Sequence, residues 1–218
     1  MPSKYDGFLI DEMNKITQEF TSKHTARETG LQISRLVIRL SANAIRAVHR
    51  KDFDKAQVLI KEAKDKLKEG KIILTEWPEI YYSGFMSDAR KEFSEACITL
   101  GIISDTGIPD AQNIGVEMAP YLNGMAETVG ELRRFILDSL RQNDISSCEE
   151  FMETMDDIYN LLVTIDFPEG VTGGLRRSTD LVRGILERTR GDLTMALRQR
   201  SLEDKLGKWE NRLSPDQV

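Results

Sequence analysis

Apolar residues recur at helical spacing along almost the whole chain, and this periodicity constrains the fold of its 218 residues more than any other feature. Side chains three and four positions apart share one face of a helix, as Leu9, Met13, Ile16 and Phe20 do near the N-terminus. The sequence has no alternating apolar and polar runs bounded by turn residues, which would predict strands. We therefore expect an all-α protein.

Prolines and glycines divide this pattern into six or seven expected helices, packed as one bundle. The first stretch, residues 3–50, is either one long helix or a helix pair that breaks near residues 21–25. Asp52 is the expected N-cap of the next helix. The remaining expected helices span residues 53–75, 80–103, 115–141, 146–165 and 175–206, and residues 166–174 form a loop. We expect a single domain over residues 1–212 and a flexible tail at 213–218.

Composition narrows the classes of function. The formal net charge of -6 argues against nucleic-acid binding unless the basic residues are clustered. No window approaches the roughly 18 apolar residues of a membrane span and no signal peptide is evident, so we expect a cytoplasmic protein.

Cys97 and Cys148 fit buried, reduced thiols. The chain has two histidines and no P-loop motif, which excludes a ferritin-like di-iron centre and P-loop nucleotide binding.

Basic residues form a stripe along the first helical stretch. Arg35, Arg39, Arg46 and Arg50 are spaced four, seven and four apart, which places them on one side of a helix. Few acids accompany them, and such stripes bind phosphate backbones. The expected C-terminal helix is also rich in arginine, but its acids offer partners at helical spacing. For that helix, an exposed salt-bridged face and a binding face are equally compatible with the sequence.

Two pairs of glutamates lie on two different expected helices. Glu92 and Glu95 are three apart, and Glu127 and Glu131 are four apart, so each pair shares one side of its helix. If the helices bring these sides together, the carboxylates form the oxygen ligand set that suits Mg²⁺ or Mn²⁺. Glu92 lies at the edge of an apolar arc, whereas Glu127 and Glu131 lie opposite one. For the second pair the pattern alone predicts a solvated face, and a metal site requires that this face line a cavity or an interface.

The chain resembles the translin/Trax family, in particular the archaeal type with a single translin-like gene product. The resemblance runs over about residues 8–206 and rests on the order and spacing of five segments: SRLVIRLSANAIRAVHRKDFDKA, KEFSEA, ETVGELRR, METMDDIYNLL and PEGVTGGLRRSTDLVRGILERTRGDLT. It implies an all-α fold of about seven helices, closed octameric shells, binding of single-stranded RNA or DNA and, in the Trax branch, Mg²⁺-dependent endoribonuclease activity.

The resemblance also carries residue roles. The Trax pattern is Glu-x-x-Glu on one helix and acid-x-x-x-Glu, with Gly before the last Glu, on the next. Glu92 and Glu95 match the first part, and Glu127, Gly130 and Glu131 match the second, although Glu127 stands where Trax usually has Asp. In a closed shell, the solvated face that carries Glu127 and Glu131 would line the inner cavity.

The hypothesis that follows is hydrolysis of single-stranded RNA within a homo-oligomer, most simply an octamer. In this hypothesis, the four catalytic glutamates hold one or two Mg²⁺ or Mn²⁺ ions, and Glu92 or Glu131 is a candidate general base. The arginine stripe binds the RNA backbone. Three alternatives stay open. They are a shell that binds single-stranded nucleic acid without catalysis, an all-α Mg²⁺-dependent nucleoside triphosphate pyrophosphatase, whose second motif usually places acids three apart, and a purely structural helical scaffold.

Overall fold

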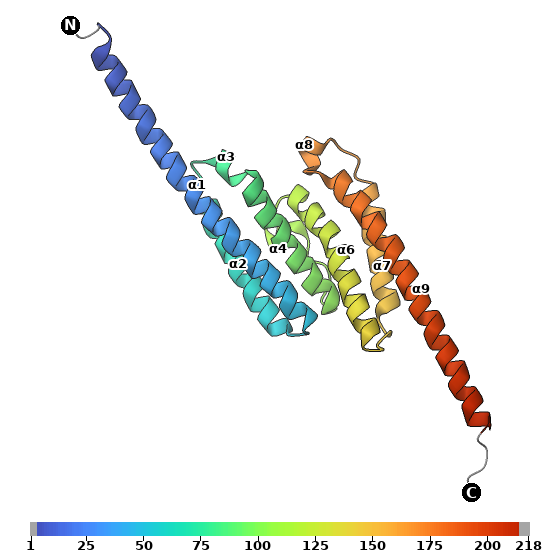
Figure 1. Cartoon of the computed structure of the whole chain (residues 1–218). Coiled ribbons are helices and arrows are strands. Elements are labelled where there is room, and N and C mark those ends of the chain that lie inside the picture. The colour runs from blue at the N-terminus through green and yellow to red at the C-terminus, as the bar shows by residue number, and fades with distance from the viewer. Residues whose placement is uncertain (1–3, 214–218) are drawn as a thin grey trace. The chain divides into compact units, whose positions relative to one another are not determined.

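The computed structural model describes residues 4–213, and the regular structure of these residues is entirely helical (Figure 1). Six helices have 16 residues or more. They are α1 (Asp6–His49), α2 (Phe53–Ile73), α4 (Gly84–Ile103), α6 (Met118–Arg141), α7 (Cys148–Val163) and α9 (Leu175–Leu213). The short helices are α3 (Pro78–Tyr81), α5 (Ala111–Ile114) and α8 (Glu169–Thr172). The all-α prediction is confirmed. Within residues 4–213, we find no helix that combines the length and apolar character needed to span a bilayer.

Helix boundaries differ from the sequence prediction at a few points. The first stretch is one helix, α1, and hydroxyls of Thr21 and Thr25 bond to carbonyls four residues back instead of interrupting it. The predicted loop at 166–174 contains the single turn α8, which Gly173 ends in the left-handed conformation. α9 extends beyond residue 206 to Leu213, and the rest of the predicted tail, 214–218, lies outside the described residues.

The chain forms two compact units, and the division falls between Gly124 and Met125. This point lies inside α6, which continues across it as one helix. In the first unit, α1 packs against α2, α3 and α4, and α2 also packs against α4. Asp52 caps α2 as predicted, because its carboxylate accepts a hydrogen bond from the Lys55 amide (3.3 Å).

The core of the first unit joins the second half of α1 to α2 and α4. Fully buried side chains from the three helices include Val37, Ala44, Ala56, Ala63 and Phe93. Ser34 Oγ on α1 donates to the Phe85 carbonyl at the start of α4 (2.7 Å). Ala44 and Ile45 pack with Ala96 further along α4, so α1 and α4 run in parallel.

In the second unit, α7 and α9 run antiparallel. Arg200 late in α9 donates to the Asn143 carbonyl just before α7 (2.9 Å), and Arg190 pairs with Asp156 in the middle of α7 (2.7 Å). The second half of α6 joins this unit through an edge-to-face contact of Phe135 with Phe151.

Two helix segments expose apolar side chains. The first lies at the start of α1, which has no buried residue before Gly30, and the second lies in α9. We call them the α1 apolar segment (Phe8, Leu9, Ile10, Met13, Ile16 and Phe20) and the α9 apolar segment (Leu181, Met195, Leu202, Leu206 and Trp209). Leu181, Met195, Leu202 and Trp209 are spaced by seven or fourteen residues, which keeps them on one side of α9.

Candidate functional site

The first glutamate pair lies on the most deeply packed helix of the first unit. Every residue of α4 from Phe93 to Gly101 is buried, and Glu95, at 8 % exposure, is among them. Glu92 is half-buried. Burying a carboxylate costs free energy unless it is hydrogen-bonded or paired with positive charge. Core packing alone therefore does not explain why a glutamate stands at position 95.

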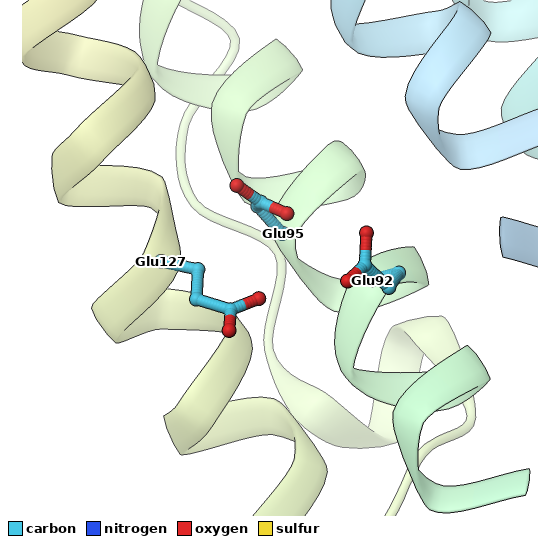
Figure 2. Close-up of side chains that lie close together, drawn as sticks. All are labelled: Glu92, Glu95 and Glu127. Atoms are coloured by element: carbon cyan, nitrogen blue, oxygen red, sulfur yellow. The ribbon is translucent and has the colours of Figure 1, made fainter. Parts of the chain in front are cut away.

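Glu127 on α6 completes a group of three acids. One carboxylate oxygen from each of Glu92, Glu95 and Glu127 can be chosen so that all three lie within 4.8 Å of one another. In Figure 2 the Glu127 side chain extends from α6 toward the two carboxylates of α4. We call these three residues the glutamate group. Glu127 comes three residues after Gly124 on the same helix, which is less than one helical turn.

The glutamate group fits a hard divalent cation. Its donors are carboxylate oxygens, which Mg²⁺ and Mn²⁺ prefer, and it contains no histidine or cysteine of the kind that favours zinc. Three negative charges this close repel one another, and a divalent cation would relieve that repulsion. Lys91, half-buried next in sequence to Glu92, brings its Nζ to 3.9 Å from the Glu92 carboxylate.

Glu131 lies one turn beyond Glu127 and outside this group. It is half-buried, and Nη1 of Arg134 lies 3.6 Å from its carboxylate. Glu127 and Glu131 are both half-buried, whereas the α6 pattern alone predicts a solvated face. The reason is that α6 is buried on more than one side, since Ala126, Thr128 and Val129 are all covered. A helical wheel with one apolar arc does not describe such a helix.

An ion pair joins the start of α6 to α4. The Arg90 side chain is 3 % exposed, and its Nε lies 2.8 Å from the Glu117 carboxylate. Arg90 also donates to the Tyr81 carbonyl (3.0 Å) and stacks on the Tyr81 ring, 4.6 Å from its centroid. Burial raises the pKa of the Tyr81 phenol, so this ring stays neutral beside the ion pair.

All four arginines of the predicted stripe are exposed: Arg35, Arg39 and Arg46 lie on one side of α1, and Arg50 follows as its C-cap residue. They lie opposite the side that Val37, Ala44 and Val48 bury against the core. Arg46 and Arg50 are held along the helix, by the Asn43 side chain (2.7 Å) and the Arg46 carbonyl (3.2 Å). The stripe therefore has the predicted local arrangement, but within one chain it does not meet the glutamate group. The C-terminal arginines partly form a salt-bridged face, as the Arg183–Glu187 pair shows (3.5 Å).

Sequence reasoning missed Arg90, Lys91, Glu117 and Gly124 around the glutamate group. The available signals were weak: a lysine beside Glu92, and a glycine in the middle of a helix. Arg90 and Glu117 lie on separate helices, and only the tertiary structure pairs them.

The chain matches known proteins over nearly its whole length, although no family model matches it. An uncharacterized protein of Methanocaldococcus jannaschii is 31% identical over 217 residues, 97% of this chain and 96% of that protein. The crystal structure of AfC3PO matches with a TM-score of 0.78 and 32% identity over 87% of this chain and 98% of its own, and a complex of AfC3PO with duplex RNA matches equally well. Apo-NeC3PO has the same fold, with a TM-score of 0.76 at 21% identity over 84% of this chain and 96% of its own.

Proposed function

The chain belongs to the translin-like C3PO family, and on that basis we propose that it is an RNA-binding, Mg²⁺-dependent endoribonuclease that acts in an oligomeric shell. The observation that carries this proposal is the glutamate group, where acids from α4 and α6 gather with the chemistry of a divalent-cation site.

In this proposal Glu92, Glu95 and Glu127 hold Mg²⁺ or Mn²⁺. The bound cation would orient and activate water and neutralise charge on the phosphate and on the leaving oxygen. Glu131, one turn away on α6, or Glu92 accepts a proton from the attacking water. The water oxygen bonds to phosphorus as the bond from phosphorus to the leaving oxygen breaks. The ammonium of Lys91 limits the net negative charge at the place that the phosphate must approach.

The substrate class rests on the arginine stripe and on the family. AfC3PO forms a complex with duplex RNA, and for this chain we propose single-stranded RNA as the substrate, with single-stranded DNA as a further ligand. Four exposed guanidinium groups along one side of α1 can contact successive phosphates without reading the bases. Comparing cleavage of single-stranded and duplex RNA of one sequence tests this preference.

The assembly is proposed from the two apolar segments. Monomeric proteins seldom expose apolar side chains in long runs, and both segments place theirs on the outside of a helix. A shell of identical chains, eight by family resemblance, would cover them and would let the stripe of one copy face the glutamate group of another. The continuity of α6 through both units supports one domain over residues 1–212, and a cytoplasmic location stays a prediction.

The test is cleavage of an unstructured RNA by the purified protein with Mg²⁺, and its loss when EDTA is added. Glu95→Ala and Glu131→Ala should each abolish cutting while the native mass stays that of the wild-type oligomer. Glu153→Ala, at an exposed position on α7, is the control and should cut normally. Undiminished cleavage in both glutamate variants would show that the site is elsewhere.

A second candidate is an RNA-binding shell without catalysis, which the RNA complex of AfC3PO favours because that complex reports binding alone. The four acids argue against it, because a purely binding surface gains affinity for phosphate by losing negative charge. Calorimetric titration with Mn²⁺ separates the two candidates: heat of binding supports the nuclease, and its absence supports the binding shell.

A further inference from the structure

Gly124 brings α6 closer to α4 than any other residue type would allow. A Cβ atom at this position would lie 2.6 Å from the Lys91 carbonyl oxygen, 2.7 Å from Ser94 Cβ and 2.9 Å from the Glu95 amide nitrogen. Real Cβ atoms essentially never approach other heavy atoms below 3.0 Å. Two of the three neighbours are main-chain atoms of α4, which cannot move aside as a flexible side chain can.

This close approach lies at the glutamate group itself. The two main-chain neighbours of Gly124 belong to the residue before Glu92 and to Glu95. On α6, Gly124 comes three residues before Glu127, so the two lie on the same side of that helix. The separation of α4 and α6 at Gly124 therefore sets how far the Glu127 carboxylate stands from the other two.

Gly124 determines how closely α6 approaches α4, and the Arg90–Glu117 ion pair determines the position of α6 along α4. Glu117 lies at the start of α6, where its carbonyl accepts a hydrogen bond from the Tyr121 amide (3.1 Å). Its partner Arg90 is almost fully buried and held on its other side by Tyr81, so it is a rigid anchor. A sliding motion of α6 along α4 would break this pair inside the protein, where an uncompensated charge is costly.

We propose that Gly124 and the Arg90–Glu117 ion pair are positioning residues that set the spacing of the metal ligands. The inference rests on the proposed function, because it assigns these residues a role at the same site. Ligand distances in a well-formed metal site lie within about 0.2 Å of their standard values. A methyl group at Gly124 requires a larger shift, since its contact with the Lys91 oxygen must lengthen from 2.6 Å to the 3.4 Å at which ordinary contacts begin.

The experiment measures Mn²⁺ affinity by calorimetry in the full chain, for the wild type, Gly124→Ala and Gly191→Ala. Gly191 is a matched control, because it lies within α9 and an added Cβ there meets nothing within 4 Å. We expect Gly124→Ala to bind Mn²⁺ about 10- to 100-fold more weakly, the range found when the support of a metal ligand is removed. Its thermal midpoint should fall below that of Gly191→Ala, because the added methyl overpacks the contact with α4, while its native mass stays the same. Gly191→Ala should bind Mn²⁺ like the wild type.

Glu117→Gln is the second variant, and it decides the question if Gly124→Ala does not fold. It keeps the side-chain volume and leaves Arg90 its contacts with Tyr81, and we expect Mn²⁺ binding about tenfold weaker. Equal affinity in the wild type and both folded variants would overturn the positioning role and leave the proposed function standing. Absence of Mn²⁺ binding in the wild type would overturn both.

Discussion

The glutamate group and the arginine stripe are both sets of like charges at helical spacing, but the fold treats them in opposite ways. The arginines lie on one helix, all exposed, and any helix over residues 35–50 would present them together. The glutamates come from two helices, and Glu95 is 8 % exposed. The stripe therefore depends on local structure alone, whereas the group exists only while α4 and α6 pack. Its properties should respond to changes in packing that leave the stripe untouched.

The largest effect is expected at the buried member of the group. Glu95→Gln keeps the side-chain shape and removes one negative ligand, so RNA cleavage should fall by about 10³-fold. RNA affinity, measured by fluorescence anisotropy without metal, should stay the same or rise slightly, because the variant has less negative charge. Loss of RNA binding in this variant would show that the glutamate group and the arginine stripe do not act independently.

Substitutions in the stripe should have the opposite signature. Arg39→Ala combined with Arg46→Ala should weaken RNA binding and lower the slope of log affinity against log salt by about 1.4, since each contact to a single strand contributes about 0.7. Cleavage at saturating RNA should stay near the wild-type rate. Arg183→Ala, whose side chain pairs with Glu187 on α9, is the control and should leave the slope unchanged.

Glu131 tests where the glutamate group ends. Because it lies outside the three gathered acids and near Arg134, Glu131→Gln should change Mn²⁺ affinity by less than about threefold. Cleavage should still fall by about 10²-fold if Glu131 takes the proton from water. A loss of metal affinity as large as that of Glu95→Gln would place Glu131 among the ligands.

The prediction with the smallest bearing on function concerns the packing of α4. Burial raises the pKa of Cys97, two residues after Glu95, from 9.0 to about 12. At pH 8, in a Cys148→Ala background, iodoacetamide should label the folded protein about 10³-fold more slowly than the urea-unfolded chain. The unfolded thiol loses its proton first, so the free energy of unfolding should decrease as pH rises from about 9 toward 12. Fast labelling of the folded protein would mean that α4 is not packed as described.

Local periodicity was enough to predict six long helices, the Asp52 cap and the stripe, because each depends on residues close in sequence. It also placed each glutamate pair on its own helix. It could not show that Glu127 joins the group while Glu131 does not, since that depends on how closely two helices approach at Gly124. The wheel for α6 failed for a related reason: it assumes one buried side, and α6 is covered on several.

The α1 apolar segment has a spectroscopic consequence. A helix that stands in water without tertiary contacts is only marginally stable, and every side chain of the α1 apolar segment is exposed. In a dissociated chain this part of α1 should fray, and contact with another copy should restore it. Far-UV circular dichroism followed on dilution would then lose helical signal at the concentration where the particle dissociates. Helix content thereby becomes a readout of assembly that needs neither RNA nor metal.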